Sequence, residues 1–310
     1  MFTWKHLAIA AGTIALTCAS IPAATAAPAH HSRTVAASTK ANALTAMHGE
    51  AFAYAKYTAF AGQAARTGKR SVAKLFLKTA SVELNDHFAD EAVIAGLVGS
   101  DAANLADAIA GETYEATTMY PAFAATATAE GCTVAADLFT EIAADEAVHA
   151  AAYQTALTSL SDASVSVPAP QVADVVTIVK SDPACAGQTL TNLLDAMHGE
   201  AFAQAKYRLY ATHAAKTGHP AIAALFAGTA KVELTEHFAG EGVLAGLVGT
   251  NAANLTAAIS GETYEATVMY PDFASQAKAV GDRAAAHEFW TAGRQEASHA
   301  RAFTKALRRS

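Results

Sequence analysis

The sequence predicts an all-α protein built from two similar four-helix bundles. The chain has 310 residues, is rich in alanine and is 52% hydrophobic, a composition typical of helical proteins. Its second half repeats the first at a fixed offset of 150 residues. Within each copy, apolar residues recur three and four positions apart, which is the spacing of amphipathic helices.

The first 27 residues have the pattern of an export signal. Lys5 and His6 form a basic start, Leu7–Leu16 is apolar, and Ala24-Thr25-Ala26 fits a cleavage site. The apolar run is too short to span a membrane, and no twin arginine is present. We therefore expect Sec-type export, and a periplasmic or extracellular location. Residues 28–39 are expected to form a disordered arm.

The repeat divides the rest of the chain. Met47–Ala53 returns unchanged as Met197–Ala203, and further motifs match without any insertion between them. This predicts modules at 40–159 and 190–308, joined by a proline-containing linker at 160–189.

Each module shows four helical patterns. In the first copy they end near Gly68, Gly99, Ala129 and Leu157. Pro121 lies inside the third pattern and is expected to kink or locally open that helix.

Acidic residues and histidines lie on the apolar stripes of all four helices. In the block Gly111–Pro121 (G-E-T-Y-E-A-T-T-M-Y-P), Glu112 and Glu115 project from one helix face. The other helices add ligands of the same kind. The candidates are Glu50, Glu83, Asp86, His87, Glu112, Glu115, Glu146 and His149, with Glu200, Glu233, Glu236, His237, Glu262, Glu265, Glu296 and His299 in the second copy.

Buried carboxylates in this number require cations or strongly raised pKa values. Carboxylate-rich sites with one or two imidazoles suit iron or manganese, whereas zinc prefers fewer ligands. The pattern also matches that of dinuclear carboxylate bundles. We therefore expect one dinuclear metal site per module, with up to four ions in the chain.

Further residues have alternative roles. His48 and His198 fall off the ligand face and are expected at the surface or in packing. Four tyrosines either hydrogen-bond to ligand carboxylates or only pack: Tyr57, Tyr207, Tyr120 and Tyr270.

Cysteine usage and charge limit the function classes. Cys132 and Cys185 could form one disulfide outside the cytoplasm. No C-x-x-C is present, which excludes a zinc ribbon or rubredoxin-type site. The net charge of −7 gives no reason to expect a nucleic-acid partner, and no later segment predicts a membrane span.

At these residues the chain resembles the rubrerythrin di-iron domain of the ferritin-like superfamily. The matching motifs are Gly49-Glu50 with Tyr57, Thr79-Ala80 with Glu83, Asn104-Leu105, the G-E-x-x-E-x-x-x-M-Y-P block, and Ile142-Ala143 with Glu146-x-x-His149. The resemblance covers both modules. It implies two ferritin-like bundles with iron at two dinuclear sites, manganese being the alternative metal.

The resemblance also implies roles. Glu83 and Glu146 would bridge the metals, Glu50 and Glu112 would be terminal ligands, and His149 would bind the metal that Glu112 holds. The same roles would fall in the second copy to Glu233, Glu296, Glu200, Glu262 and His299.

At one ligand position this chain departs from the pattern of the family. By resemblance, Glu115 (Glu265 in the second copy) exchanges with a histidine when the iron changes oxidation state. The family's histidine lies three residues after the second-helix glutamate, where this chain has Asp86 and Glu236. His87 and His237 follow one residue later. Because positions i+3 and i+4 both flank residue i of a helix, either residue stays a candidate.

The resemblance implies reduction of hydrogen peroxide or dioxygen, with Glu115, Glu265, Tyr57 and Tyr207 as catalytic residues. The family's rubredoxin domain is missing from the sequence, so a separate electron donor is expected. The alternatives are a non-catalytic iron-binding protein of ferroxidase or storage type, and a structural helical repeat.

Ferritin-like bundles run helices two and three parallel, so their connection must travel the length of the bundle. Only about seven residues, Val98–Asn104, join them, and seven extended residues span at most about 25 Å. Two arrangements stay open. Each copy closes its own bundle, or helices one and two of each copy pair with helices three and four of the other.

Overall fold

The computed structural model describes residues 34–309, in which every regular element is a helix. The expected export signal and residues 28–33 lie outside the described residues. The elements are α1 (Ala37–Arg66), α2 (Arg70–Val82), η1 (Glu83–His87), α3 (Phe88–Ala95), α4 (Asp101–Tyr114), η2 (Glu115–Met119), α5 (Tyr120–Ala129), α6 (Thr133–Ser159), α7 (Gly187–Lys216), α8 (Pro220–Val232), η3 (Glu233–His237), α9 (Phe238–Leu244), α10 (Asn251–Tyr264), η4 (Glu265–Met269), α11 (Tyr270–Ala279) and α12 (Arg283–Leu307).

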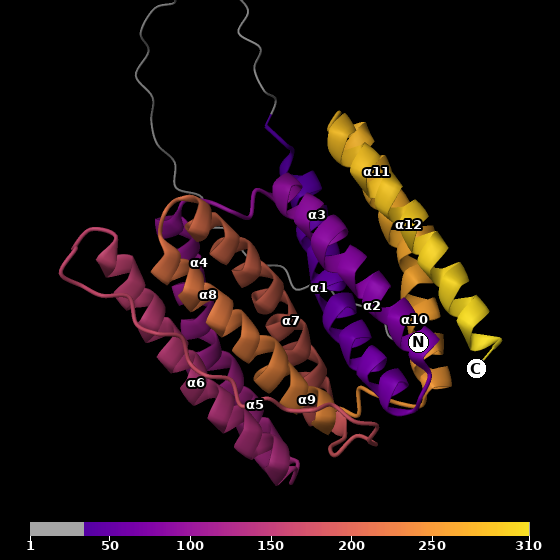
Figure 1. Ribbon diagram of the computed structural model, residues 1–310, viewed down its shortest axis with the longest axis horizontal. Coiled ribbons are helices and arrows are strands. Elements are labelled where there is room, and N and C mark those ends of the chain that lie inside the picture. The colour runs from indigo at the N-terminus through magenta and orange to yellow at the C-terminus, as the bar shows by residue number, and fades with distance from the viewer. Residues whose placement is uncertain (1–33, 310) are drawn as a thin grey trace, which may run out of the picture. The chain divides into compact units, whose positions relative to one another are not determined.

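The helices form two four-helix bundles, and each bundle is built from both copies of the repeat (Figure 1). Bundle 1 packs α1–α3 against α10–α12, and bundle 2 packs α7–α9 against α4–α6. The predicted all-α fold is confirmed. Of the two arrangements left open above, the chain adopts the exchange of helix pairs between copies.

The short connection after α3 explains the exchange. Gly96 ends α3 in the left-handed conformation, with φ of 71°, which glycine adopts without steric cost. Helix α4 already begins at Asp101, after the Ser100 hydroxyl has accepted a hydrogen bond from the Ala103 N–H. The residues between cannot carry the chain back along bundle 1, so α4 enters bundle 2.

The two bundles meet through α1 and α7 with reciprocal contacts. His48 stacks on Phe202 at 3.9 Å between ring centroids, and Phe52 stacks on His198 at 3.8 Å. These pairs are related by the repeat offset, as the contacts of an isologous dimer are. His48 and His198 are therefore packing residues, one of the two roles expected for them.

Four π-helical turns interrupt the long helices at the glutamates of the sequence motifs. In η1 the Phe88 N–H donates to the Glu83 carbonyl, and in η2 the Tyr120 N–H donates to the Glu115 carbonyl. The turn η2 ends directly before the Tyr120-Pro121 pair, so the local opening expected at this proline takes the form of a π turn. The second copy repeats both turns as η3 and η4.

The first helix of each copy starts earlier than predicted because a carboxylate caps it. Asp282 accepts hydrogen bonds from the Ala36 N–H (2.8 Å) and the Thr39 hydroxyl (2.7 Å), so helix α1 takes in the last residues of the expected arm. Glu130 accepts from the Thr189 N–H (2.7 Å) and its hydroxyl (2.6 Å) at the start of α7. Carboxylates at helix N-termini satisfy free N–H groups and complement the helix dipole.

The linker between α6 and α7 contains no helix or strand, and a Cys132–Cys185 disulfide ties it to the start of α6. Within residues 34–309, none of the helices combines the length and the apolar character needed to cross a membrane.

Candidate metal centres

Each bundle contains two clusters of three glutamates and one histidine, and the two clusters share two of the glutamates. Within each cluster the candidate ligand atoms lie within 4.8 Å of one another. The clusters of bundle 1 are Glu50, Glu83, His87 and Glu296, and Glu83, Glu262, Glu296 and His299. Those of bundle 2 are Glu146, Glu200, Glu233 and His237, and Glu112, Glu146, His149 and Glu233.

The shared glutamates lie where bridging ligands of a dinuclear centre would lie. They are Glu83 with Glu296 in bundle 1, and Glu146 with Glu233 in bundle 2. Each bridging pair therefore combines one glutamate from each copy, instead of two from one copy as the resemblance implied. His149 lies in the same cluster as Glu112, as expected.

The π turns decide which residue after the second-helix glutamate faces the cluster. Hydrogen bonds from i+5 to i widen the turn, so residue i+3 rotates away from residue i while i+4 stays beside it. His87 Nδ1 accordingly lies 3.0 Å from Glu83 Oε2 and 2.6 Å from Glu296 Oε1. Asp86 is exposed and belongs to none of the clusters of residues 34–309.

Glu236, the counterpart of Asp86, lies at the rim of bundle 2. Its carboxylate accepts a hydrogen bond from the Asp174 N–H of the linker at 2.7 Å. Together with Asp145 and His237 it forms a further group, which includes neither of the shared glutamates of bundle 2. The structure thus brings His87 and His237, but not Asp86 and Glu236, among the shared glutamates.

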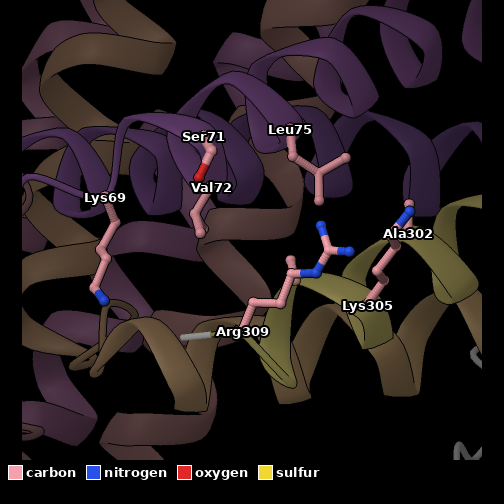
Figure 2. A pocket seen from close by; sticks show the side chains of 8 residues that line it. Lys69, Ser71, Val72, Leu75, Ala302, Lys305 and Arg309 are labelled. Carbon is pink, nitrogen blue, oxygen red and sulfur yellow. The ribbon is translucent and has the colours of Figure 1, made fainter.

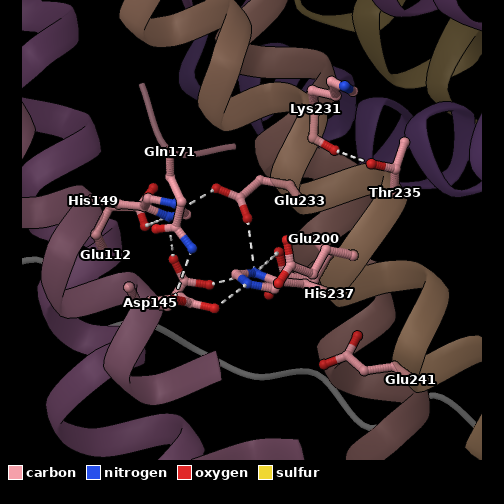
Figure 3. Close-up of polar contacts among 12 residues, drawn as sticks. Glu112, Asp145, His149, Gln171, Glu200, Lys231, Glu233, Thr235, His237 and Glu241 are labelled. Carbon is pink, nitrogen blue, oxygen red and sulfur yellow. Dashed lines mark hydrogen bonds and ion pairs between the residues drawn. The ribbon is translucent and has the colours of Figure 1, made fainter. Parts of the chain in front are cut away.

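The outer nitrogens of these two histidines contact hydrogen-bond acceptors. His87 Nε2 lies 2.8 Å from Gln295 Oε1, and His237 Nε2 lies 3.4 Å from Asp145 Oδ2. Figure 3 shows His237 between Asp145 and the glutamates. A proton on Nε2 satisfies these acceptors and leaves the Nδ1 lone pair facing the cluster, which is the tautomer that a metal ligand needs.

Many of the inward-facing atoms lack a hydrogen-bond partner. Both carboxylate oxygens of Glu83 and of Glu233 are buried without one, as are Nδ1 of His87 and Nδ1 of His237. Leaving buried polar atoms unpaired is costly. Cations among these atoms would satisfy all of them together, so the residues present fit a dinuclear metal centre.

In the absence of metal, protons and imidazolium groups must balance the acids. Burial raises the pKa of Glu50 and of Glu200 to about 8. Burial alone would also raise the pKa of Glu233, but the positive charges of His149 and His237 lower it to about 2. Such opposed shifts within one cluster are typical of functional sites.

The four tyrosines hydrogen-bond to cluster glutamates that are not shared, and each of these hydrogen bonds joins the two copies. The Tyr57 hydroxyl donates to Glu262 at 2.6 Å, and that of Tyr207 donates to Glu112. Tyr270 donates to Glu50, and Tyr120 donates to Glu200. Hydrogen bonding, rather than packing alone, is therefore the role that the structure assigns to them.

Two buried glutamates were missed in the sequence. Glu91 accepts from the Tyr270 hydroxyl at 2.6 Å, and Glu241 accepts from the Tyr120 hydroxyl at 2.9 Å. Their exposed fractions are 1% and 0%. The available signal was their recurrence at the repeat offset, one helical turn after His87 and His237.

Glu115 and Glu265 lie beside the clusters rather than within them. An ideal Cβ on Gly49 would lie 3.6 Å from Glu265 Oε1, and one on Gly199 would lie 3.7 Å from Glu115 Oε1. The two carboxylates thus pack over glycines that directly precede ligand positions. Burial, reinforced by the charge of Glu112, raises the pKa of Glu115 to about 8.

Removing the Tyr270 hydroxyl is expected to destabilise the metal-free protein. In Tyr270→Phe, two buried carboxyl groups lose a shared hydrogen-bond partner, which should lower the free energy of unfolding by about 1–3 kcal/mol. Urea denaturation measures this change. The matched control is Tyr264→Phe on α10, where the side chain is 53% exposed, and a change below about 0.5 kcal/mol is expected. Equal effects of the two substitutions would contradict the assignment.

A surface pocket of about 300 Å³ lies elsewhere in bundle 1, between the start of α2 and the end of α12 (Figure 2). Lys69, Ser71, Lys305 and Arg309 supply its polar lining. Its lining includes none of the clustered glutamates or histidines, so this pocket is separate from the candidate centres.

Comparison with known proteins points to one family. The family model described as Rubrerythrin matches residues 42–157 and 232–307. A rubrerythrin from Porphyromonas gingivalis is 38% identical over 140 residues, which cover 41% of this chain and 70% of the relative. A nigerythrin from Nitratidesulfovibrio vulgaris is 38% identical over 138 residues, covering 40% of the chain and 68% of the relative. No solved structure matches the chain significantly.

Proposed function

Since the chain belongs to the rubrerythrin family, we propose that it is an oxidoreductase that reduces hydrogen peroxide or dioxygen at two dinuclear iron centres, one in each bundle. The observation that carries the proposal is the overlap of two Glu/His clusters in each bundle, with two glutamates in common. Oxygen-rich ligand sets with one imidazole per metal suit iron, with manganese as the alternative.

The bound metals would supply the electrons and the Lewis acidity for the reaction. The chain would supply protons, because reduction of peroxide to two waters consumes two electrons and two protons. Glu115, whose pKa is raised to about 8 by burial, holds a proton at neutral pH beside the cluster. The hydroxyls of Tyr57 and Tyr207 would supply further protons, which they donate in hydrogen bonds to Glu262 and Glu112.

The proposal also includes a separate electron donor and export of the chain. The Cys132–Cys185 disulfide supports a location outside the reducing cytoplasm. N-terminal sequencing of the mature protein from a native source tests export, which predicts a start near residue 28 and is contradicted by an intact residue 1.

Peroxide titration tests the proposed reaction. The iron-loaded protein is reduced without oxygen and then given stoichiometric hydrogen peroxide, while its absorption spectrum is followed. We expect reoxidation by one peroxide per dinuclear centre. The Glu83→Ala chain, which lacks a shared glutamate of bundle 1, should consume half as much peroxide per chain. Iron that stays ferrous would contradict the proposal.

The same clusters support a second candidate, an iron-storage protein of ferroxidase type. The four overlapping Glu/His clusters lead us to expect specific binding of about one ion each. Uptake of ferrous iron far beyond this number, without peroxide turnover, would favour storage.

A further inference from the structure

One pair of equivalent positions distinguishes the two candidate centres. Residues 145 and 295 are related by the repeat offset and contact the outer nitrogen of a cluster histidine in each bundle. Position 145 holds an aspartate, whose Oδ2 lies 3.4 Å from His237 Nε2. Position 295 holds a glutamine, whose Oε1 lies 2.8 Å from His87 Nε2.

The chemical difference between these acceptors reaches the metal through the imidazole ring. An anionic acceptor draws the Nε2 proton more strongly than an amide oxygen does, and so makes Nδ1 a better electron donor. A stronger donor favours metal binding in general and the more highly charged, oxidised metal in particular. Changes at such outer positions typically alter metal affinity about 10–100-fold.

The linker holds Asp145 in this position. Gln171 Nε2 donates to Asp145 Oδ1 at 2.8 Å, which leaves Oδ2 for His237. Three residues further, the Asp174 N–H donates to Glu236 at 2.7 Å, so this part of the linker crosses the rim of bundle 2. The linker sequence has no second copy in the chain, and within residues 34–309 Gln295 receives no hydrogen bond equivalent to that of Gln171 on Asp145.

The solvent exposure of the cluster histidines also differs between the two bundles. The side chain of His299 in bundle 1 is 16% exposed, whereas that of its counterpart His149 in bundle 2 is 2% exposed. An enclosed site strengthens the attraction between a cation and its carboxylates. The anionic acceptor and the lower solvent exposure therefore both favour tighter metal binding in bundle 2.

We propose that the two centres are inequivalent, with the centre of bundle 2 binding metal more tightly and favouring its oxidised state more than the centre of bundle 1. The inference rests on the proposed function. Asp145 and Gln295 act as positioning residues through His237 and His87. Electrons from the donor would therefore reside first on bundle 1, whose centre is the more easily reduced of the two.

Anaerobic titration of the metal-free full chain with ferrous iron, followed by calorimetry, tests the inference. We expect two classes of sites that differ about tenfold or more in affinity. Asp145→Asn should weaken the tighter class toward the other, and Gln295→Glu should strengthen the weaker class. Both substitutions preserve side-chain length. Asp137→Asn, at an exposed position on the same helix α6, removes the same charge and should leave both classes unchanged.

A redox titration of the iron-loaded protein gives a readout that a merely structural role would not move. Two midpoint potentials are expected, which Asp145→Asn brings together and Asp137→Asn leaves apart. A single class of sites with a single potential, or variants that shift neither quantity, would overturn the inference and leave the proposed function standing. Failure of both bundles to bind iron would overturn the proposed function as well. If Asp145→Asn does not fold, Gln295→Glu decides the question alone.

Discussion

The metal-free protein is expected to lose stability as the pH rises from about 6.5 to 8.5, while the metal-loaded protein gains stability over the same range. Burial holds the pKa of Glu50, Glu115 and Glu200 at about 8, against 4.5 for a free glutamate. The folded state therefore binds more protons than the unfolded state between these values. The stabilisation by these protons is complete below pH 4.5 and is lost as the pH rises through 8.

The shifts of Glu233 and His299 do not reverse this sign. The pKa of Glu233 is lowered to about 2, so its contribution is present above pH 4.5 and is lost only as the pH falls through 2. Burial disfavours the charged form of His299, but hydrogen bonds to Glu262 and Glu296 raise its pKa to about 12. Its contribution is complete below pH 6.5 and declines as the pH rises through 12, which acts in the same direction as the glutamates.

Each proton bound only by the folded state changes the free energy of unfolding by about 1.4 kcal/mol per pH unit. Metal ions compete with these protons, so metal binding tightens as the pH rises and the slope changes sign. Urea denaturation at several pH values, with and without iron, measures both slopes. Glu50→Gln, which cannot titrate, should flatten the slope of the metal-free protein. Parallel slopes with and without metal would contradict a shared site for protons and metal.

The fold could be predicted from the sequence because its signals are local and occur twice. Apolar spacing located the four helices of each module, and the repeat set their number. Helices α1 and α7 begin three residues before their predicted starts. The carboxylates that cap them, Asp282 and Glu130, lie far away in sequence and gave no local signal. Loop length raised the exchange of helix pairs as one of two arrangements, but only tertiary contacts decide between them.

The candidate site was predictable in composition but not in detail. Acids and histidines on apolar stripes identified its ligands. The π turns change the helical period at the ligands themselves, so the choice between Asp86 and His87 could not follow from an α-helical spacing. The same change of helical period prevented the prediction that Glu91 is buried. Because Glu91 follows an acidic neighbour, its sequence context is that of a solvated charge. The pairing of Asp145 with His237 joins residues from opposite copies and has no local signal.

The central claim is that each metal centre is assembled from both copies of the repeat. Glu83 shares its clusters with Glu296, not with Glu146, which lies in the other bundle. Two double substitutions therefore have opposite consequences. Glu83→Ala with Glu296→Ala removes ligands from one centre only, whereas Glu83→Ala with Glu146→Ala removes a shared ligand from both.

Elemental analysis of the two double variants after iron loading tests this claim most directly, with circular dichroism to verify that both are folded. One ion is expected for each of the four buried clusters of the unsubstituted chain. The assembly of each centre from both copies predicts half of that content in Glu83→Ala/Glu296→Ala and almost none in Glu83→Ala/Glu146→Ala. The reverse result, with half the iron retained in Glu83→Ala/Glu146→Ala and almost none in Glu83→Ala/Glu296→Ala, would contradict it.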